Sequence, residues 1–480
     1  MVENDGHSEV VYKPTTKVKD KVLLENQNKQ KDSAFLYFTA TIVSLVSSSG
    51  LCSYIWMSPA LAVLKLDDQN LNPIGRPVTP FEESIIGGIW LIGSIAGNLM
   101  LGKLPDIFGR KKIMILISIL MIIGYSVLAF SSTIYIIYIA RLITGIAFGM
   151  YLPLLSVYLF EISESHNRGK FGSFICLFLT LSSGYVFLLA TFFSLKVFTF
   201  LCALPAALCL LCFLFVPETP MHLVSKGDRK GATKALRKLR GRDDVRKEVE
   251  EIESLLNECS RGKNKTILEA LRTPGLKRAL FLAVSVNSLQ QLIGQTAILG
   301  YLTSIFVSAG ISPDFASIIS CLVQLPSTII AAMLVDKLGR RVLLLISLTT
   351  YGTAIVLLGV YFYLKHLNFD FGSFSWLPVA SVILMFIGYC IGMGVIPIIL
   401  ASEVLPNDIK SVGMSITVFC AGVFASVTVF GFPIVMEYLG LYWCFWICGI
   451  VSFLAAIFVY YCVPETKGKS VAEIQKMLNS

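Results

Sequence analysis

The chain has 480 residues, of which 55% are hydrophobic and only 15% are charged, and its mean hydropathy is +0.73. A water-soluble domain carries about 25% charged residues. This composition therefore excludes a water-soluble globular protein, because the chain has too few charged residues to cover the surface of one. The formal net charge of +9 is confined to segments between long apolar runs, and it therefore does not indicate a nucleic-acid partner.

Residues 1–33 form a polar tail that contains six lysines and precedes the first apolar run. A helix that crosses the hydrocarbon core of a bilayer needs about 20 mostly apolar residues. Windows of this length predict twelve membrane-spanning helices. They cover roughly 34–64, 83–103, 112–131, 133–160, 171–192, 196–216, 279–308, 314–335, 342–364, 375–401, 412–435 and 439–462. The predicted fold class is an all-α membrane protein.

The charges between the predicted spans indicate the orientation of the chain, because short cytoplasmic loops collect Lys and Arg. With the N-terminus inside, the cytoplasmic side receives the lysines of the tail and sixteen Lys and Arg of the segment 217–278. The opposite side receives only four basic residues, which are Lys65, Arg76, Lys196 and Lys365. This asymmetry predicts that both termini are cytoplasmic.

The segment 217–278 separates the sixth and seventh spans and is rich in charge. Its apolar residues recur at helical spacing, namely Ala232, Ala235, Leu236 and Leu239, then Val249, Ile252, Leu255 and Leu256. This spacing predicts short amphipathic helices at the cytoplasmic surface. A flexible linker is the alternative interpretation.

Three pairs of motifs recur in the same order in the two sets of six spans. The pairs are Asp106 to Lys111 with Asp336 to Arg341, Glu161 and Arg168 with Glu403 and Lys410, and Pro217-Glu218-Thr219 with Pro464-Glu465-Thr466. We therefore expect two related six-helix bundles, 34–216 and 279–462, with a cytoplasmic tail at 463–480 as well as at 1–33. Proteins built from such repeats bind substrate near the bilayer midplane between them.

These motifs and several others resemble those of the sugar porter family in the major facilitator superfamily, and most of all the insect facilitated trehalose transporters. The matching residues are Gly102-Lys103-Leu104, Asp106 to Lys111, Arg141 to Gly145, Tyr158, Glu161 to Gly169, Pro217 to Pro220, Gln290 to Gly294, Asp336 to Arg341, Gly394 to Pro397, Glu403 and Pro464 to Gly468. The resemblance extends from the first span to Ile474. It implies the major facilitator fold, with twelve transmembrane helices in two bundles.

The resemblance also implies a gating network of charges at the cytoplasmic ends of the two bundles. In the first bundle it would comprise Asp106, Arg110, Lys111, Glu161 and Arg168, and in the second Asp336, Arg340, Arg341, Glu403 and Lys410, with Glu218 and Glu465 bridging to them. These pairs would hold the cytoplasmic side closed and then break as the bundles rock. The alternative is that the charges only fix the topology.

Two adjacent amides in the seventh span, Gln290 and Gln291, are the first candidates for substrate contact. An amide offers both a donor and an acceptor, and a sugar hydroxyl uses both. Polar side chains inside a membrane are costly without a partner, although hydrogen bonding between helices is an alternative role. The resemblance adds Thr296, Tyr301 and Gln324 as substrate-binding residues.

Several positions depart from the family pattern. Cys176, Thr296 and Gln324 replace the usual amides, the tenth-span motif lacks its tryptophan, and Glu164 replaces a proline. Each lost neutral hydrogen bond weakens binding by about 0.5–1.5 kcal/mol. Two alternatives to sugar transport therefore stay open, a transporter-like sugar sensor or receptor with little flux and a carrier of another neutral solute.

The expected activity is facilitated diffusion of a small neutral sugar, a hexose or a trehalose-like disaccharide, through a plasma membrane. The first span, 34–64, contains no Asp or Glu, so the acid that proton coupling requires is missing there. Neither a nucleotide-binding loop nor a catalytic or metal-binding pattern occurs, so we expect no enzyme activity, cofactor, metal or ATP. Arg141 is expected to be structural, and His222 is expected to lie on the surface.

Overall fold

The computed structural model is helical throughout the part of the chain that it describes. That part consists of residues 33–68, 70–102, 104–164, 167–261, 274–312, 322–324, 326–327, 330, 338–369, 376–406, 410–467, 469, 473–474 and 477. For residues 168, 169, 172, 173, 176, 257–261, 274, 410 and 411 only the backbone is described.

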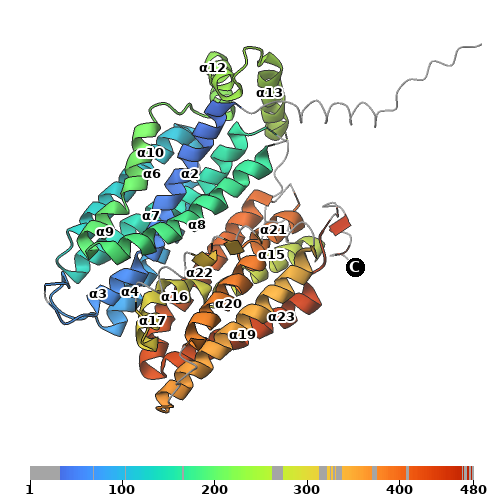
Figure 1. The fold of residues 1–480 in the computed structure, drawn as a ribbon. Helices are drawn as coiled ribbons and strands as arrows, with labels where there is room; N and C mark the ends of the chain where they lie inside the picture. The colour runs from blue at the N-terminus through green and yellow to red at the C-terminus, as the bar shows by residue number, and fades with distance from the viewer. Residues whose placement is uncertain are drawn as a thin grey trace, which may run out of the picture.

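The helices form two bundles that lie side by side (Figure 1). The N-half consists of α2 (Ala34–Ile55), α3 (Met57–Leu64), α4 (Pro80–Leu101), α5 (Leu104–Phe108), α6 (Arg110–Ala129), α7 (Ile134–Ile162), α8 (Arg168–Phe192), α9 (Leu195–Leu201) and α10 (Leu204–Cys212). The C-half consists of α15 (Pro274–Leu292), α16 (Gln295–Gly300), α17 (Leu302–Ala309), α19 (Arg340–His366), α20 (Leu377–Ile391), α21 (Ile396–Val404), α22 (Lys410–Tyr438) and α23 (Leu441–Cys462).

Nine helices or helix pairs of the described residues are long and apolar enough to cross a membrane. They agree with nine of the twelve predicted spans to within a few residues. A tenth, Gly275–Gly300 with Leu302–Ala309, bends by 66° between its two parts. The predicted span 171–192 is represented by the shorter apolar stretch Leu177–Phe192, and the predicted span 314–335 lies mostly outside the described residues.

Small residues bring α4 and α7 into close contact in the N-half. Gly93 and Gly97 on α4 face Gly145 and Gly149 on α7, and a Cβ added at any of the four would meet the backbone of the other helix. Both pairs have the Gly-xxx-Gly spacing that lets helix backbones approach closely in a membrane. The four glycines therefore determine how closely α4 and α7 pack, because they place no side chain between the two backbones.

Three short helices, α11 (Pro220–Ser225), α12 (Arg229–Arg240) and α13 (Arg246–Arg261), lie at one end of the N-half (Figure 1). We call this the α12 end of the molecule, and the opposite end, where α3 and α17 meet, the α3 end. Leu236, Val245 and Val249 form a small buried core between these helices. The helical spacing in segment 217–278 thus coincides with α12 and α13, which pack together as a unit.

Candidate functional site

A cavity of about 310 Å³ lies between the two halves. Its polar lining residues are Tyr54, Thr180 and Ser183 from the N-half and Gln295, Thr296, Gln324 and Tyr389 from the C-half. The other described lining residues are apolar apart from Cys390 and Gly394, and no Asp, Glu, Lys or Arg lies among them. Amide and hydroxyl groups both donate and accept, so this lining suits an uncharged solute that carries hydroxyl groups.

A larger cavity of about 620 Å³ is lined mainly by α2, α8 and α10. Its lining is almost entirely apolar, and hydroxyl groups in it are already committed within the chain. Ser182 donates to the carbonyl of Phe178, and Tyr185 donates to the carbonyl of Leu201. This cavity has no amide side chain among its described lining residues, whereas the smaller cavity has two, so the smaller cavity is the candidate binding site.

The break between α15 and α16 brings polar groups to the cavity. Gly294, with φ of 82°, ends one helical segment and begins the next, so that Gln295 and Thr296 line the cavity. The Thr296 hydroxyl donates to Gln291 Oε1 at 2.7 Å. Thr296 and Gln291 thus lie together, and Thr296 is the one that lines the cavity.

Gln290 is engaged by the tenth span. Its Nε2 donates to the Tyr389 hydroxyl at 3.2 Å and to the carbonyl of Met393 at 2.5 Å. Both donor hydrogens of the amide are therefore used within the protein. Since Tyr389 lines the cavity, Gln290 orients a lining residue in this conformation, which is the interhelical role that the sequence left open.

Tyr301 lies away from the cavity, in the contact that closes the α3 end. Its ring is fully buried and stacks on Phe432, with 5.3 Å between centroids and 5° between planes. Its hydroxyl donates to the carbonyls of Val429, at 3.3 Å, and Glu83, at 3.5 Å. Of the five predicted substrate residues, the structure places Thr296 and Gln324 on the cavity and the other three behind it or beyond it.

Five polar lining residues were not among the predicted substrate residues: Tyr54, Thr180, Ser183, Gln295 and Tyr389. The Tyr54 hydroxyl donates to the carbonyl of Thr296 and so joins the two halves. Gln295 could have been found from the sequence, because it directly follows the glycine that interrupts the seventh span. The others have no such signal, since the chain has 18 tyrosines and only packing determines which of them face the cavity.

Arg141, a charge well inside a predicted span, is fully buried in the N-half. Its guanidinium donates to the carbonyls of Ile86, at 3.2 Å, and Ser53. It also lies 5.5 Å from the centroid of the Trp90 ring and 5.7 Å from that of Trp56. Arg141 therefore joins α7 to α2 and α4 and stays outside the cavity lining, as expected for a structural residue.

Hydrogen bonds join the two halves at the α3 end. The Ser58 and Thr303 hydroxyl oxygens are 2.9 Å apart, and the Thr303 backbone N–H donates to Ser58 Oγ at 3.0 Å. On the same side, the Phe81 and Phe430 rings meet edge to face at 6.2 Å. From these contacts the ribbons of the two halves diverge toward the α12 end (Figure 1).

The predicted charge network of the N-half is centred on Arg110. Its guanidinium pairs with Glu161 at 2.9 Å and with Asp106 at 3.0 Å. The Glu218 carboxylate accepts from the backbone N–H groups of Arg110, at 3.0 Å, and Lys111, at 3.1 Å. This carboxylate caps the start of α6, where the helix dipole favours a negative charge.

The C-half repeats this arrangement around Arg340. Its guanidinium pairs with Glu403 at 3.0 Å, and the Glu465 carboxylate accepts from the N–H groups of Arg340, at 2.9 Å, and Arg341, at 3.1 Å. Burial acts to raise the pKa of Glu465, but the backbone hydrogen bonds that it accepts outweigh burial and hold the pKa below its ordinary value. The duplicated motifs thus form duplicated structures.

A glycine makes room for each capping carboxylate. Gly109 has φ of 100° and Gly339 has φ of 88°, which other residues rarely adopt. A Cβ at Gly109 would lie 3.0 Å from Cδ of Glu218, and one at Gly339 would lie 2.7 Å from Oε2 of Glu465. The glycine of this motif is therefore required both by the backbone and by the carboxylate.

All the ion pairs that Arg110 and Arg340 form with described residues lie within one half. They are present in a conformation whose halves diverge at the α12 end (Figure 1), and each of them joins residues of the same half. Asp336 and the side chains of Arg168 and Lys410 lie outside the described residues.

The prediction that His222 lies on the surface is wrong, because its side chain is only 6% exposed. Its Nδ1 lies 3.2 Å from a guanidinium nitrogen of Arg110. Burial lowers the pKa of His222; Glu218 opposes this shift and Arg110 adds to it. The imidazole is therefore neutral near pH 7 and serves as an acceptor for Arg110. The sequence could not predict the contact between His222 and Arg110 because the two residues are far apart in the chain. They meet because α11 folds back onto α6.

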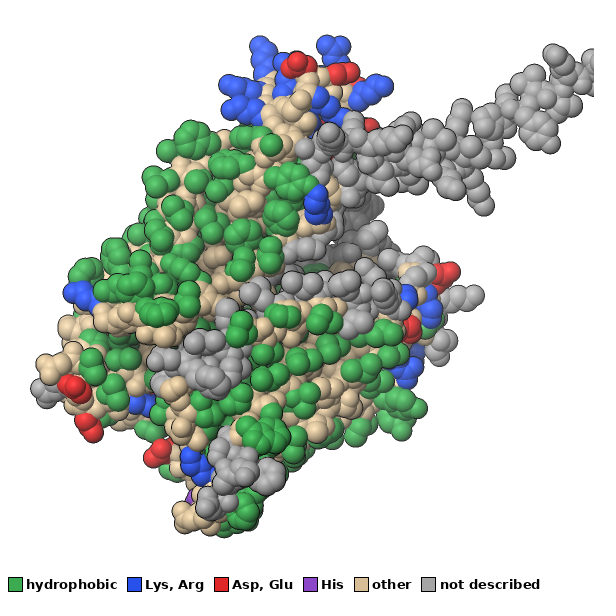
Figure 2. Space-filling view, viewed as in Figure 1, with side chains coloured by type: hydrophobic (Ala, Val, Ile, Leu, Met, Phe, Trp, Pro, Cys, Tyr) green, Lys and Arg blue, Asp and Glu red, His purple; other side chains and the backbone are tan. Residues whose placement is uncertain are grey.

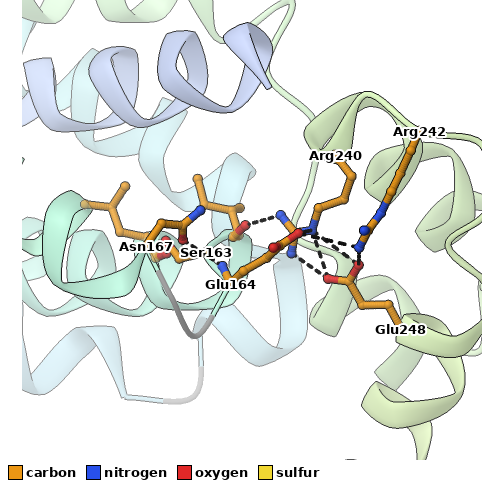
Figure 3. A network of polar contacts seen from close by, with 8 residues as sticks. Ser163, Glu164, Asn167, Arg240, Arg242 and Glu248 are labelled. Atoms are coloured by element: carbon orange, nitrogen blue, oxygen red, sulfur yellow. Dashed lines mark hydrogen bonds and ion pairs between the residues drawn. The ribbon is translucent and has the colours of Figure 1, made fainter. Parts of the chain in front are cut away.

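Arg240, at the end of α12, holds the short helices against the N-half (Figure 3). Its guanidinium pairs with Glu164 at 2.8 Å and with Glu248 at 2.6 Å, and it donates to the carbonyl of Ile162, the last residue of α7, at 2.7 Å. The Arg240 side chain is only 5% exposed. Glu164 stands where the sugar porter pattern has proline, so this departure supplies one of the two carboxylates of the clamp.

Comparisons with known proteins agree with this fold. A family model described as "Sugar (and other) transporter" matches residues 17–478. The facilitated trehalose transporter Tret1 of Bombyx mori is 30% identical over 482 residues, which cover 100% of this chain and 91% of that protein. Tret1 of Polypedilum vanderplanki is 28% identical over 486 residues, with 100% and 92% covered.

Solved structures share the arrangement of the two halves. The inward open conformation of the xylose transporter XylE from E. coli has a TM-score of 0.75 at 22% identity and covers 92% of this chain and 98% of its own. The proton:xylose symporter XylE bound to 6-bromo-6-deoxy-D-glucose has a TM-score of 0.71 at 23% identity, with 93% and 100% covered. At these identities the likeness establishes the fold.

Proposed function

The chain belongs to the sugar transporter family of the major facilitator superfamily, and from this premise we propose that it carries a small neutral sugar, a hexose or a trehalose-like disaccharide, by alternating access. The observation that carries the proposal is the cavity between the halves, whose described lining is polar but uncharged. The relatives named above include facilitated trehalose transporters, which supports the choice of a sugar as the solute.

The composition of the cavity favours hydroxyl groups over charged groups. Gln324, Gln295 and Thr296 offer two amides and one hydroxyl from the C-half, and Thr180 faces them from the N-half. A volume of about 310 Å³ lies at the small end of the ~300–1,000 Å³ range of ligand pockets. A hexose or a small disaccharide is therefore favoured over a longer saccharide.

The contacts at the α3 end support alternating access through weak, reversible closure. Neutral hydrogen bonds such as those between Ser58 and Thr303 contribute only about 0.5–1.5 kcal/mol each. A few bonds of this strength close one side without locking it, and differential binding of a solute can shift such an equilibrium. The halves then rock about the cavity, which opens to each side in turn.

We place the α12 end in the cytoplasm of a plasma-membrane protein, with both termini on that side, because α11 to α13 and the adjoining loops carry most of the basic residues. We also propose facilitated diffusion. The described cavity lining contains no carboxyl group, and the first span contains none either. A proton-coupled carrier requires an acid whose pKa changes with conformation in the substrate pathway.

Uptake of labelled glucose and trehalose into proteoliposomes tests the proposal. Saturable uptake is expected, with KM raised about two- to tenfold by Thr296→Val or Gln324→Leu, since each removes about one neutral hydrogen bond. Thr349→Val is the matched control, because this exposed hydroxyl bonds only to carbonyls of its own helix. The control is expected to keep the original KM.

Two other outcomes would replace the proposal. Sugar binding without flux would identify a transporter-like sensor or receptor. Saturable uptake of a polyol or another neutral solute, with no competition from sugars, would identify a carrier of a different substrate. In both cases the same cavity variants, compared with Thr349→Val, show whether the described cavity is the site.

A further inference from the structure

A row of lysines follows one face of α12. Lys230, Lys234 and Lys238 are spaced by four residues, and Lys226 continues the row in the turn before the helix. Residues four apart lie on the same face of a helix, and all four lysines are exposed. Figure 2 shows the basic side chains that gather over this end of the molecule. We call Lys226, Lys230, Lys234 and Lys238 the α12 lysine row.

The row does not stabilise the helix. Like charges four residues apart on a helix repel one another, and the first turn of α12, where acids would be favourable, contains none. The acids nearby have other partners. Glu250 and Glu253 pair with Arg229 at 3.7 and 3.3 Å, and Glu248 pairs with Arg240. None of the four lysines forms an ion pair with another described residue.

The row ends at the boundary of the membrane. α12 contacts α2, the first membrane-spanning helix, and Lys111 lies in the first turn of the membrane-spanning helix α6. Lys112, beside it, is exposed. Because Arg110 at the start of α6 contacts His222 of α11, the two lysines that follow Arg110 lie at the same end of the N-half as the row.

The row is also held in place. The Arg240 clamp fixes the end of α12 to the end of α7, and Ala232, Ala235, Leu236 and Leu239 bury the opposite face of the helix. A charged face that is already ordered loses little conformational entropy when it binds. This face is therefore prepared for a ligand of opposite charge at the membrane surface.

We propose that the α12 lysine row, with Lys111 and Lys112, binds the headgroups of anionic phospholipids in the adjoining leaflet. Clusters of four to eight basic residues next to a transmembrane helix attract anionic lipid. Each basic residue near the surface raises the affinity about fivefold. The position of Lys111 at the start of α6 selects a lipid headgroup rather than a soluble acidic protein as the occupant. The inference is independent of which solute the protein transports.

Lysine footprinting of the full chain tests the proposal directly. The protein is placed in nanodiscs of phosphatidylcholine alone or with one third of the lipid replaced by phosphatidylserine, and acetylation of each lysine is followed by mass spectrometry. We expect Lys230, Lys234 and Lys238 to react about fivefold more slowly with phosphatidylserine present, and high salt to remove the difference. Lys247, exposed on α13, is expected to react equally in both discs.

Paired variants provide a second measurement. Phosphatidylserine added to the detergent-solubilised chain is expected to raise its Tm. Lys234→Gln with Lys238→Gln is expected to raise the half-saturating concentration of that lipid about 25-fold, fivefold for each lysine removed. Arg246→Gln with Lys247→Gln removes the same charge from exposed positions on α13 and is expected to leave it unchanged.

Three results would overturn the proposal. Equal acetylation of the row in both discs, or equal effects of the two paired variants, would show that the row has no preference for anionic lipid. Protection of the row by polyglutamate in phosphatidylcholine discs, without protection by phosphatidylserine, would identify an acidic protein segment as the ligand. None of these results bears on sugar uptake, so the proposed transport function is tested separately.

Discussion

A covalent lock at the α3 end tests whether this end must open during transport. The Ser58 and Thr303 hydroxyl oxygens are 2.9 Å apart. Sulfur lies further from Cβ than oxygen does, so cysteines at both positions would bring their sulfurs close to the ~2.05 Å of a disulfide. The double variant Ser58→Cys with Thr303→Cys is therefore expected to cross-link on mild oxidation.

The magnitude follows from comparing the lock with the contacts that it replaces. Four hydrogen bonds between described residues join the halves here, two between Ser58 and Thr303, one from Tyr301 to Glu83 and one from Tyr54 to Thr296. At about 0.5–1.5 kcal/mol each, they total roughly 2–6 kcal/mol, which thermal motion overcomes in each cycle. A disulfide cannot be broken in this way. Uptake by the oxidised double variant should therefore equal the fraction of molecules that remain uncross-linked.

The assay is uptake of labelled sugar into proteoliposomes before oxidation, after oxidation and after reduction. The single variants Ser58→Cys and Thr303→Cys, oxidised in the same way, control for the other cysteines of the chain. Full uptake by a completely cross-linked protein would refute the view that the α3 end opens. Failure to cross-link, with both cysteines reactive, would show that these two residues do not meet.

Three further predictions follow from individual contacts, and a fourth concerns pH. Arg240→Met removes three charged hydrogen bonds, worth about 1.5–3 kcal/mol each when well formed. It is expected to speed amide exchange in α12 and α13 at least tenfold; unchanged exchange would mean that the clamp does not hold these helices. Gly109→Ala is expected to lower Tm and uptake more than Gly227→Ala, since both have positive φ but only Gly109 adjoins a carboxylate; equal effects would contradict the role of that carboxylate. Glu83 is a buried acid that pairs with Lys65 at 2.9 Å. Uptake by the unmodified protein and by Glu83→Gln is expected to be equally independent of a proton gradient; accumulation driven by the gradient in the unmodified protein but not in Glu83→Gln would show that this acid couples transport to protons. The pKa of Glu465 is lowered in the folded protein, so its contribution to stability is complete above the unfolded pKa of about 4.3 and is lost as the pH falls through the folded value. Thermal melts at several pH values should show that Glu465→Gln has a lower Tm than the unmodified protein at neutral pH and the same Tm in acid. A Tm difference that persists in acid would rule out a stabilising role for the ionised carboxylate.

The candidate site was partly predictable. The amides near the break in the seventh span mark the right region, because a polar pair inside an apolar segment is conspicuous in any sequence. Sequence spacing does not report side-chain direction, however. Gln290 turns toward Tyr389, and Tyr301 packs into the closure at the α3 end, whereas Thr296 and Gln324 line the cavity.

By itself the sequence determined the family, the duplicated motifs and nine of the spans to within a few residues, because the hydrophobic length of a helix and the charges at its ends are local properties of the chain. The tertiary structure decided which polar groups line the cavity and which lie in the contact between the halves at the α3 end. It also decided which partners Arg110 and Arg340 have in their charge networks. Those outcomes depend on residues distant in sequence, such as Arg240 with Glu164 and Tyr54 with Thr296. Only packing of the helices brings such residues within hydrogen-bonding distance.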